Sequence, residues 1–159
     1  MRLLLFILCT FACNISFGQK RPDLDTFVNE NVLKGASEEV KQLAKKNVAH
    51  FYAIAFVFDK TGKIDTLYFS KSLNAETKQL YGLDNLLLKR IKKYDFHYVE
   101  YSSQTVLIPF YHYNSTDECV AYKSGFLNSF EGLLPEAIKN KPIIVRNPII
   151  NAHIPRISN

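Results

Sequence analysis

The stretch that decides the fold is FVFDKTGKIDTLYFSK, residues 56–71. Aromatic and β-branched residues lead into the turn sequence Asp59-Lys60-Thr61-Gly62, and a more polar run of alternating residues follows. Gly62 stands where a tight turn needs a positive φ, which glycine adopts without a steric cost. The pattern therefore predicts two antiparallel strands joined by a tight turn.

The first of these strands extends back to His50 and is apolar on both faces. Its even-numbered positions carry large side chains, whereas the odd-numbered positions include Ala53 and Ala55. A strand of this kind is buried on both sides of its sheet. The small residues indicate that another element, which we expect to be a helix, packs closely against that face.

Capped amphipathic segments predict helices on both sides of the hairpin. Residues 22–34 form a short helix with Asp23 or Asp25 as its cap, and residues 38–46 form a second. Residues 83–94 carry a leucine-rich stripe opposite a basic face, which is typical of a helix packed on a sheet.

A third strand and an extended segment complete the chain. Residues 104–113 read as a strand, in which Pro109 lacks an N–H and indicates an edge position or a bulge. Residues 141–159 contain two Pro-Ile-Ile units, which exclude a helix. We expect this segment to be extended, either as a packed closing strand or docked on a partner by strand addition.

These elements predict a single α+β domain over residues 19–159. Its small antiparallel sheet is built as strand, turn, strand, helix and strand, with N-terminal helices before it and an extended C-terminal segment after it. A chain of 159 residues is of ordinary size for one domain.

Residues 1–18 have the pattern of a secretory signal peptide: Arg2, an apolar run, and small residues near its end. We expect cleavage after Gly18 and a periplasmic or secreted mature chain. The alternatives are lipid attachment at Cys13, which would give a lipid-anchored envelope protein, and an uncleaved anchor. No other segment of the sequence is apolar and long enough to cross a membrane.

The residue pattern favours binding over catalysis. The formal charge is +5, but the chain has no aromatic-basic RNA motif, so nucleic acid is not an expected partner. The four histidines are scattered, without a pair at metal-binding spacing. The nearest cluster is His112 with Asp117, Glu118 and Cys119, where we expect a polar loop and a buried cysteine. We therefore predict no metal, no cofactor and no catalytic residue.

Between residues 50 and 113 the chain resembles the C-terminal domain of TonB-like proteins. The resemblance lies in an apolar strand ending in Asp59, a turn containing Gly62, a return strand, a Leu83-Asp84 helix start and an apolar strand over 106–110. It implies a periplasmic protein-interaction module that uses a sheet edge. The sequence has no Pro-rich spacer, so we do not expect an energy-transducing role.

We therefore expect an exported, non-enzymatic protein-interaction module of the bacterial cell envelope. Its partner would be an envelope protein or peptide that contacts the sheet edge. The strand expected to make this contact carries Val106, Ile108, Phe110, Tyr111 and Tyr113. The alternative is a small-ligand-binding pocket protein, with the N-terminal helices over a curved sheet and a lining drawn from 12 Phe and 9 Tyr residues.

Overall fold

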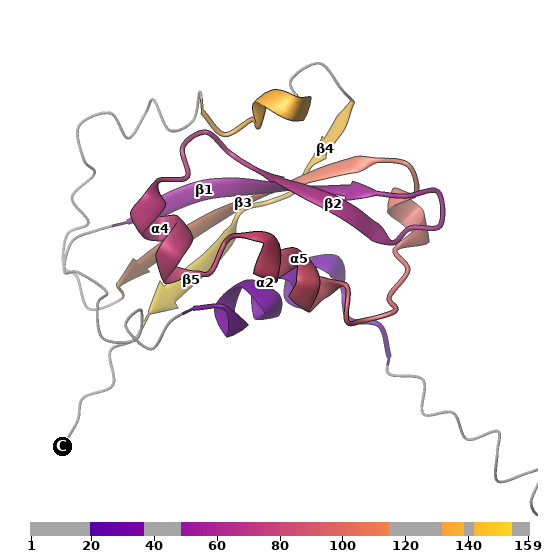
Figure 1. The fold of residues 1–159 in the computed structure, drawn as a ribbon, viewed down its shortest axis with the longest axis horizontal. Coiled ribbons are helices and arrows are strands. Elements are labelled where there is room, and N and C mark those ends of the chain that lie inside the picture. Colours follow the sequence, from indigo (N-terminus) through magenta and orange to yellow (C-terminus); the bar gives the residue numbers. More distant parts are fainter. Residues whose placement is uncertain (1–19, 37–48, 115–131, 139–141, 154–159) are drawn as a thin grey trace, which may run out of the picture.

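The computed structural model describes residues 20–36, 49–114, 132–138 and 142–153 (Figure 1). They form one mixed sheet of five strands with helices packed on it, which confirms the predicted α+β class. The elements in chain order are α2 (Leu24–Lys34), β1 (His50–Phe58), β2 (Ile64–Phe69), α4 (Ala75–Leu80), α5 (Asn85–Ile91), η1 (Val99–Tyr101), β3 (Thr105–Asn114), η2 (Glu136–Ile138), β4 (Ile143–Val145) and β5 (Ile149–His153). The predicted helix over 38–46 lies outside the described residues.

The predicted hairpin is confirmed, and its turn is held from both sides. β1 and β2 pair antiparallel, and Gly62 has a φ of +82°. The Asp59 carboxylate accepts hydrogen bonds from the backbone N–H groups of Thr61 (2.7 Å) and Lys63 (3.0 Å). The backbone N–H of Tyr98 donates to the Gly62 carbonyl (2.8 Å). The turn therefore fixes the segment that leads into β3.

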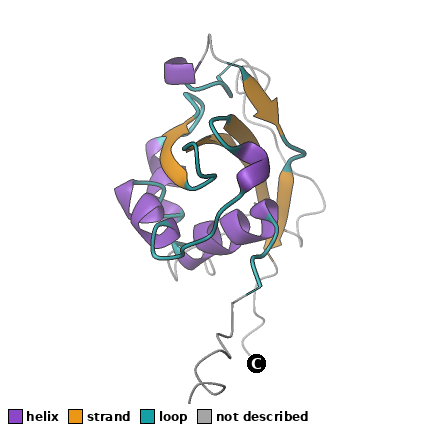
Figure 2. Ribbon diagram, turned by 90° about the vertical axis from the view of Figure 1, so that its right-hand side faces the viewer, coloured by secondary structure: helices purple, strands orange, loops and turns teal. Residues whose placement is uncertain are grey.

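The helices cover the sheet face that bears the even-numbered side chains of β1 and β3 (Figures 1 and 2). Asp23 caps α2 and Asp84 caps α5. The helix predicted over 83–94 ends earlier, at Ile91. The cause is aromatic packing. Tyr94 and Phe96 both pack against Phe27 of α2, so the chain turns back instead of continuing the helix.

The opposite face of the sheet is covered by the segment that contains η2. Ile138 is buried there against Ala53, Ala55 and Leu107. The close packing predicted from the two alanines is therefore confirmed. The described element that packs there is a short 3-10 helix of three residues.

The predicted edge position of the third strand is wrong, because β3 is an interior strand. β1 pairs with one side of it antiparallel, and β4 and β5 both pair with the other side in parallel. The strands before the C-terminal segment are antiparallel as predicted, and the added strands make the complete sheet mixed. The C-terminal segment is thus extended and pairs within its own chain.

The position of Pro109 explains how an interior strand accepts a proline. Its cross-strand partner is Ala53. Ala53 donates its N–H to the Ser70 hydroxyl (3.0 Å) and accepts from the Ser70 N–H (2.9 Å), and Ser70 directly follows β2 on the other side of β1. The missing N–H of Pro109 therefore faces the C-terminal segment. There it falls between the last β4 partner, Leu107, and the first β5 partner, Phe110, so no ladder hydrogen bond is lost.

Polar contacts with α2 hold the C-terminal strands in place. Arg146 donates two hydrogen bonds to the Asp25 carboxylate (2.6 and 3.3 Å). The side-chain amides of Asn29 and Asn151 bond each other reciprocally (3.2 and 2.9 Å). The N-terminal helix therefore clamps the segment that covers the β3 edge.

We expect Gly62→Ala to lower the free energy of unfolding by about 1–3 kcal/mol. A Cβ at this position would meet the Tyr98 carbonyl carbon at 2.6 Å, in addition to the strain of a positive φ. Denaturant unfolding of both proteins measures the difference. Lys60→Ala in the same turn is the control and should lie within about 0.5 kcal/mol of the unmodified chain. Equal stability of all three proteins would contradict the described turn.

We expect Arg146→Ala to weaken hydrogen-exchange protection across β5. The side chains of Arg146 and Asp25 are about one third exposed, at 36% and 29%, so screening limits the pair. A double-mutant cycle with Asp25→Ala should give a coupling of about 0.5–1 kcal/mol. Lys34→Ala, which removes an exposed pair with Glu30 on α2, should leave β5 protection unchanged. Zero coupling would show that the clamp adds no stability.

Candidate binding cleft and sheet edge

The residues predicted to contact a partner divide between the two faces of β3. Val106, Ile108 and Phe110 are fully buried on the helix-covered face. Tyr111 and Tyr113 are half-buried on the opposite face. Contact between this strand and a partner stays a prediction, and only the two tyrosines offer it any surface.

The open edge of the described sheet is the outer side of β2. Ser70 donates its N–H to Ala53 (2.9 Å), which sets the alternation of hydrogen bonds between β1 and β2. The N–H and C=O groups of Leu67 and Phe69 therefore point away from β1. Within the described ranges, no strand pairs with this side of β2. A register irregularity opposite Asp65 ends the regular edge.

A cleft of about 330 Å³ lies at the beginning of β2. The hairpin turn, the end of α5 and the segment after α5 surround it, and α2 contributes the ring of Phe27. Its lining residues are Phe27, Asp59, Lys63, Ile64, Asp65, Ile91, Lys92, Lys93, Tyr94, Asp95, Phe96 and Tyr98. Half of these residues are charged, and the others are apolar or aromatic.

Aromatic rings form one side of the cleft. Phe27 meets Tyr94 and Phe96 edge-on, with ring centroids 5.3 and 5.2 Å apart. The rings of Tyr94 and Phe96 stack on each other at 5.5 Å. Edge-to-face and offset-stacked rings at these distances attract each other, so the wall is fixed before anything binds.

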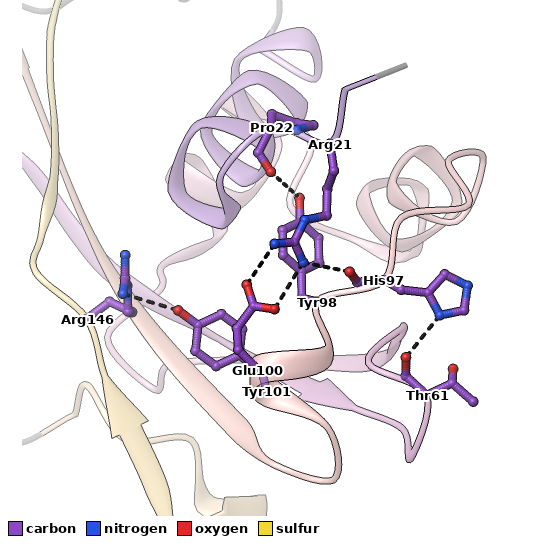
Figure 3. A network of polar contacts seen from close by, with 8 residues as sticks. All are labelled: Arg21, Pro22, Thr61, His97, Tyr98, Glu100, Tyr101 and Arg146. Carbon is purple, nitrogen blue, oxygen red and sulfur yellow. Dashed lines mark hydrogen bonds and ion pairs between the residues drawn. The ribbon is translucent and has the colours of Figure 1, made fainter. Parts of the chain in front are cut away.

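Tyr98, another wall residue, is held by the segment before α2 (Figure 3). The guanidinium of Arg21 lies 4.6 Å from the Tyr98 ring centroid, and the Tyr98 hydroxyl donates to the Pro22 carbonyl (3.3 Å). Arg21 also bonds both carboxylate oxygens of Glu100 (3.0 and 3.1 Å) and the His97 carbonyl (2.6 Å). Burial raises the pKa of Tyr98, so its hydroxyl stays protonated and remains a donor.

Two ion pairs cross the mouth of the cleft in opposite directions. Lys63 of the hairpin contacts Asp95 beyond α5 (2.5 Å), and Lys92 contacts Asp65 of β2 (3.9 Å). The hydrogen bond from Lys63 lowers the pKa of Asp95, so this carboxylate is ionised at neutral pH. All four side chains are substantially exposed, and each pair therefore stabilises the fold little.

A second polar cluster lies in the core, away from the cleft. The hydroxyl of Tyr52 is 3.0 Å from Nε2 of His112, and both residues are fully buried. Burial raises the pKa of Tyr52 and of its neighbour Tyr81. The other members of the His112 cluster considered from sequence, residues 117–119, lie outside the described ranges. Among the described residues, no three His, Cys, Asp or Glu gather as metal ligands.

Sequence reasoning missed the cleft because its walls come from distant segments. Lys92, Lys93 and Tyr94 read as two faces of one long helix, whereas the chain turns after Ile91. One feature of the sequence could have indicated the cleft. The return strand begins with Lys63 and Asp65 on either side of a single apolar residue, so charged and apolar groups lie together there.

We expect Glu100→Gln to remove a pH-dependent contribution to stability of about 0.2–1 kcal/mol. The hydrogen bond from Arg21 lowers the folded pKa of Glu100 below its ordinary value of 4.5. The contribution is therefore complete above pH 4.5 and is lost as the pH falls through the folded pKa. Urea unfolding between neutral and acidic pH measures the difference between the two proteins. In chains that also carry Arg21→Gln, Glu100→Gln should no longer change the free energy of unfolding. A stability difference between the unmodified chain and Glu100→Gln that does not depend on pH would count against the contact.

No protein-family profile, curated protein or solved structure matches this chain. The resemblance of residues 50–113 to TonB-like C-terminal domains stays a prediction from sequence. In the described part of the chain, no helix has the length and apolar character needed to cross a bilayer.

Proposed function

We propose that this chain is an exported, non-enzymatic protein-interaction module of the bacterial cell envelope. It binds an extended segment of an envelope protein or peptide, which adds as a strand to the outer side of β2. The observation that carries the proposal is an open strand edge that continues into a cleft. Export rests on the leader pattern of residues 1–18.

Strand addition requires backbone groups that are not already bonded. Leu67 and Phe69 present an N–H and a C=O each on the outer side of β2, at the two-residue spacing of a strand. The opposite edge of the sheet is built from β4 and β5, which are separated by residues 146–148, including Pro148. That edge is interrupted, whereas β2 is regular from Thr66 to Phe69.

The TonB-like resemblance supports a module of this kind, since it also implies an interaction through a sheet edge. In this chain, however, the C-terminal strands occupy the outer side of β3. We therefore assign the interaction to β2 instead of the strand that carries Val106 and Tyr111.

A small-ligand site is the second candidate, and the cleft is the observation that favours it. Ligand pockets commonly measure about 300–1,000 Å³ and are mostly apolar. This cleft, at about 330 Å³, is near the lower limit, and half of its lining residues are charged. Such a cleft suits one side chain of a peptide better than a whole small molecule.

We expect peptides selected from a displayed library on residues 19–159 to slow hydrogen exchange at Leu67 and Phe69. Leu67→Pro, which removes one outward N–H, should weaken binding of a selected peptide about tenfold or more, because the bond and the local strand geometry are both lost. Leu67→Val keeps the N–H and is the matched control. Circular dichroism checks that both variants fold.

If a bound peptide slows hydrogen exchange at β5 instead of β2, the assignment of the binding edge to β2 is overturned. The same holds if it slows exchange nowhere on β2. Equal binding by Leu67→Pro and Leu67→Val would do the same.

A further inference from the structure

The cleft lies on the path of a strand bound at β2. Lys63, Ile64 and Asp65, at the beginning of β2, are part of its lining. A strand that bonds Leu67 and Phe69 reaches the end of the regular edge at Asp65, which is itself part of the cleft lining. Alternate side chains of a strand share one face, so every second side chain of that strand can turn toward the cleft.

The inner part of the cleft is apolar. Ile64, Ile91 and Phe27 are buried at its base, and the ring of Tyr94 is 36% exposed beside them. A ligand side chain entering here contacts aliphatic groups and ring surfaces, and it removes them from water. The physical match is an aromatic or large aliphatic side chain.

Three lysines and three aspartates line the cleft, so its formal charge is zero, but the charges are unevenly placed. The Asp59 carboxylate lies in the hairpin turn, where it accepts from the Thr61 N–H and hydroxyl and from the Lys63 backbone N–H. Asp95 contacts Lys63, and Asp65 contacts Lys92 at the longer distance of 3.9 Å. Lys93 has no ion-pair partner among the described residues, so one unpaired positive charge lies on the α5 side of the mouth.

We propose that the segment bound at β2 is acidic: an aromatic or large aliphatic side chain enters the cleft, and carboxylates two residues away on the same face meet Lys92 and Lys93. This inference rests on the proposed function and names the chemistry of the partner. The apolar side chain supplies burial, and the carboxylates supply a partner for the unpaired Lys93 and a closer one for Lys92, whose contact with Asp65 is long.

Three synthetic peptides test this chemistry, TDTFTDT, TDTSTDT and TKTFTKT. The acidic residues flank the central phenylalanine at two positions on either side, so the peptide suits either strand direction. Binding to residues 19–159 is followed through the NMR amide signals of Leu67, Phe69 and Lys93. We expect the serine peptide to bind about tenfold more weakly, and the lysine peptide about fivefold more weakly, than TDTFTDT.

Lys93→Glu should weaken TDTFTDT about fivefold and should improve binding of TKTFTKT, because the charge of the mouth is reversed. Lys89→Glu makes the same charge change on α5, four residues earlier and outside the cleft lining, and is the matched control, with affinities close to those of the unmodified chain. Added salt should reduce the difference between the acidic and basic peptides.

The outcomes separate the two proposals. If all three peptides move the Leu67 and Phe69 signals with equal affinity, the β2 edge binds strands and the acidic-aromatic preference is overturned. If Lys89→Glu and Lys93→Glu have equal effects, the preference belongs to overall charge and the cleft assignment is overturned. If no peptide moves the β2 signals at millimolar concentration, the proposed function fails and this inference fails with it.

Discussion

The contact on which the rest of the structure depends is the backbone hydrogen bond between Gly62 and Tyr98. It joins the hairpin turn to the segment that enters β3, and the close approach leaves no room for a Cβ on Gly62. The Tyr98 ring then packs against the guanidinium of Arg21, and the Tyr98 hydroxyl donates to the Pro22 carbonyl. This bond thus ties the hairpin turn to the segment before β3, and through Tyr98 it positions a wall of the cleft and the chain before α2.

The two sides of the described sheet differ in whether a further strand covers them. On the β3 side, the chain supplies its own strands, and the break between β4 and β5 coincides with the missing donor of Pro109. On the β2 side, the edge is shortened by an irregular register near Asp65 but is not covered by a described strand. Proteins commonly limit open edges by such devices to prevent aggregation. In our proposal, the short regular stretch left on β2 receives the partner strand, and the cleft beside it selects the partner's side chains.

The hairpin, the turn glycine and the α+β class could be predicted from sequence, and the α2 cap could be narrowed to Asp23 or Asp25, because each depends on residues close together in the chain. The interior position of β3 could not, since a proline shows that a donor is missing without showing which neighbour it faces. The early end of α5 depends on Phe27, which is far away in the sequence. For the same reason the cleft was missed, and the apolar alternation of Val106, Ile108 and Phe110 indicated burial more directly than partner contact.

The clamp between α2 and the C-terminal strands also bears on how the chain folds. Arg146 and Asp25 are 121 positions apart, and Asn29 and Asn151 are 122 apart. Contacts of such long sequence separation form slowly, because a large loop must close first. Until residues 143–153 arrive, α2 lacks its polar partners and β3 has one unpaired side. The native domain is therefore completed only when α2 and the C-terminal strands meet, and a chain still emerging from a ribosome stays incompletely folded.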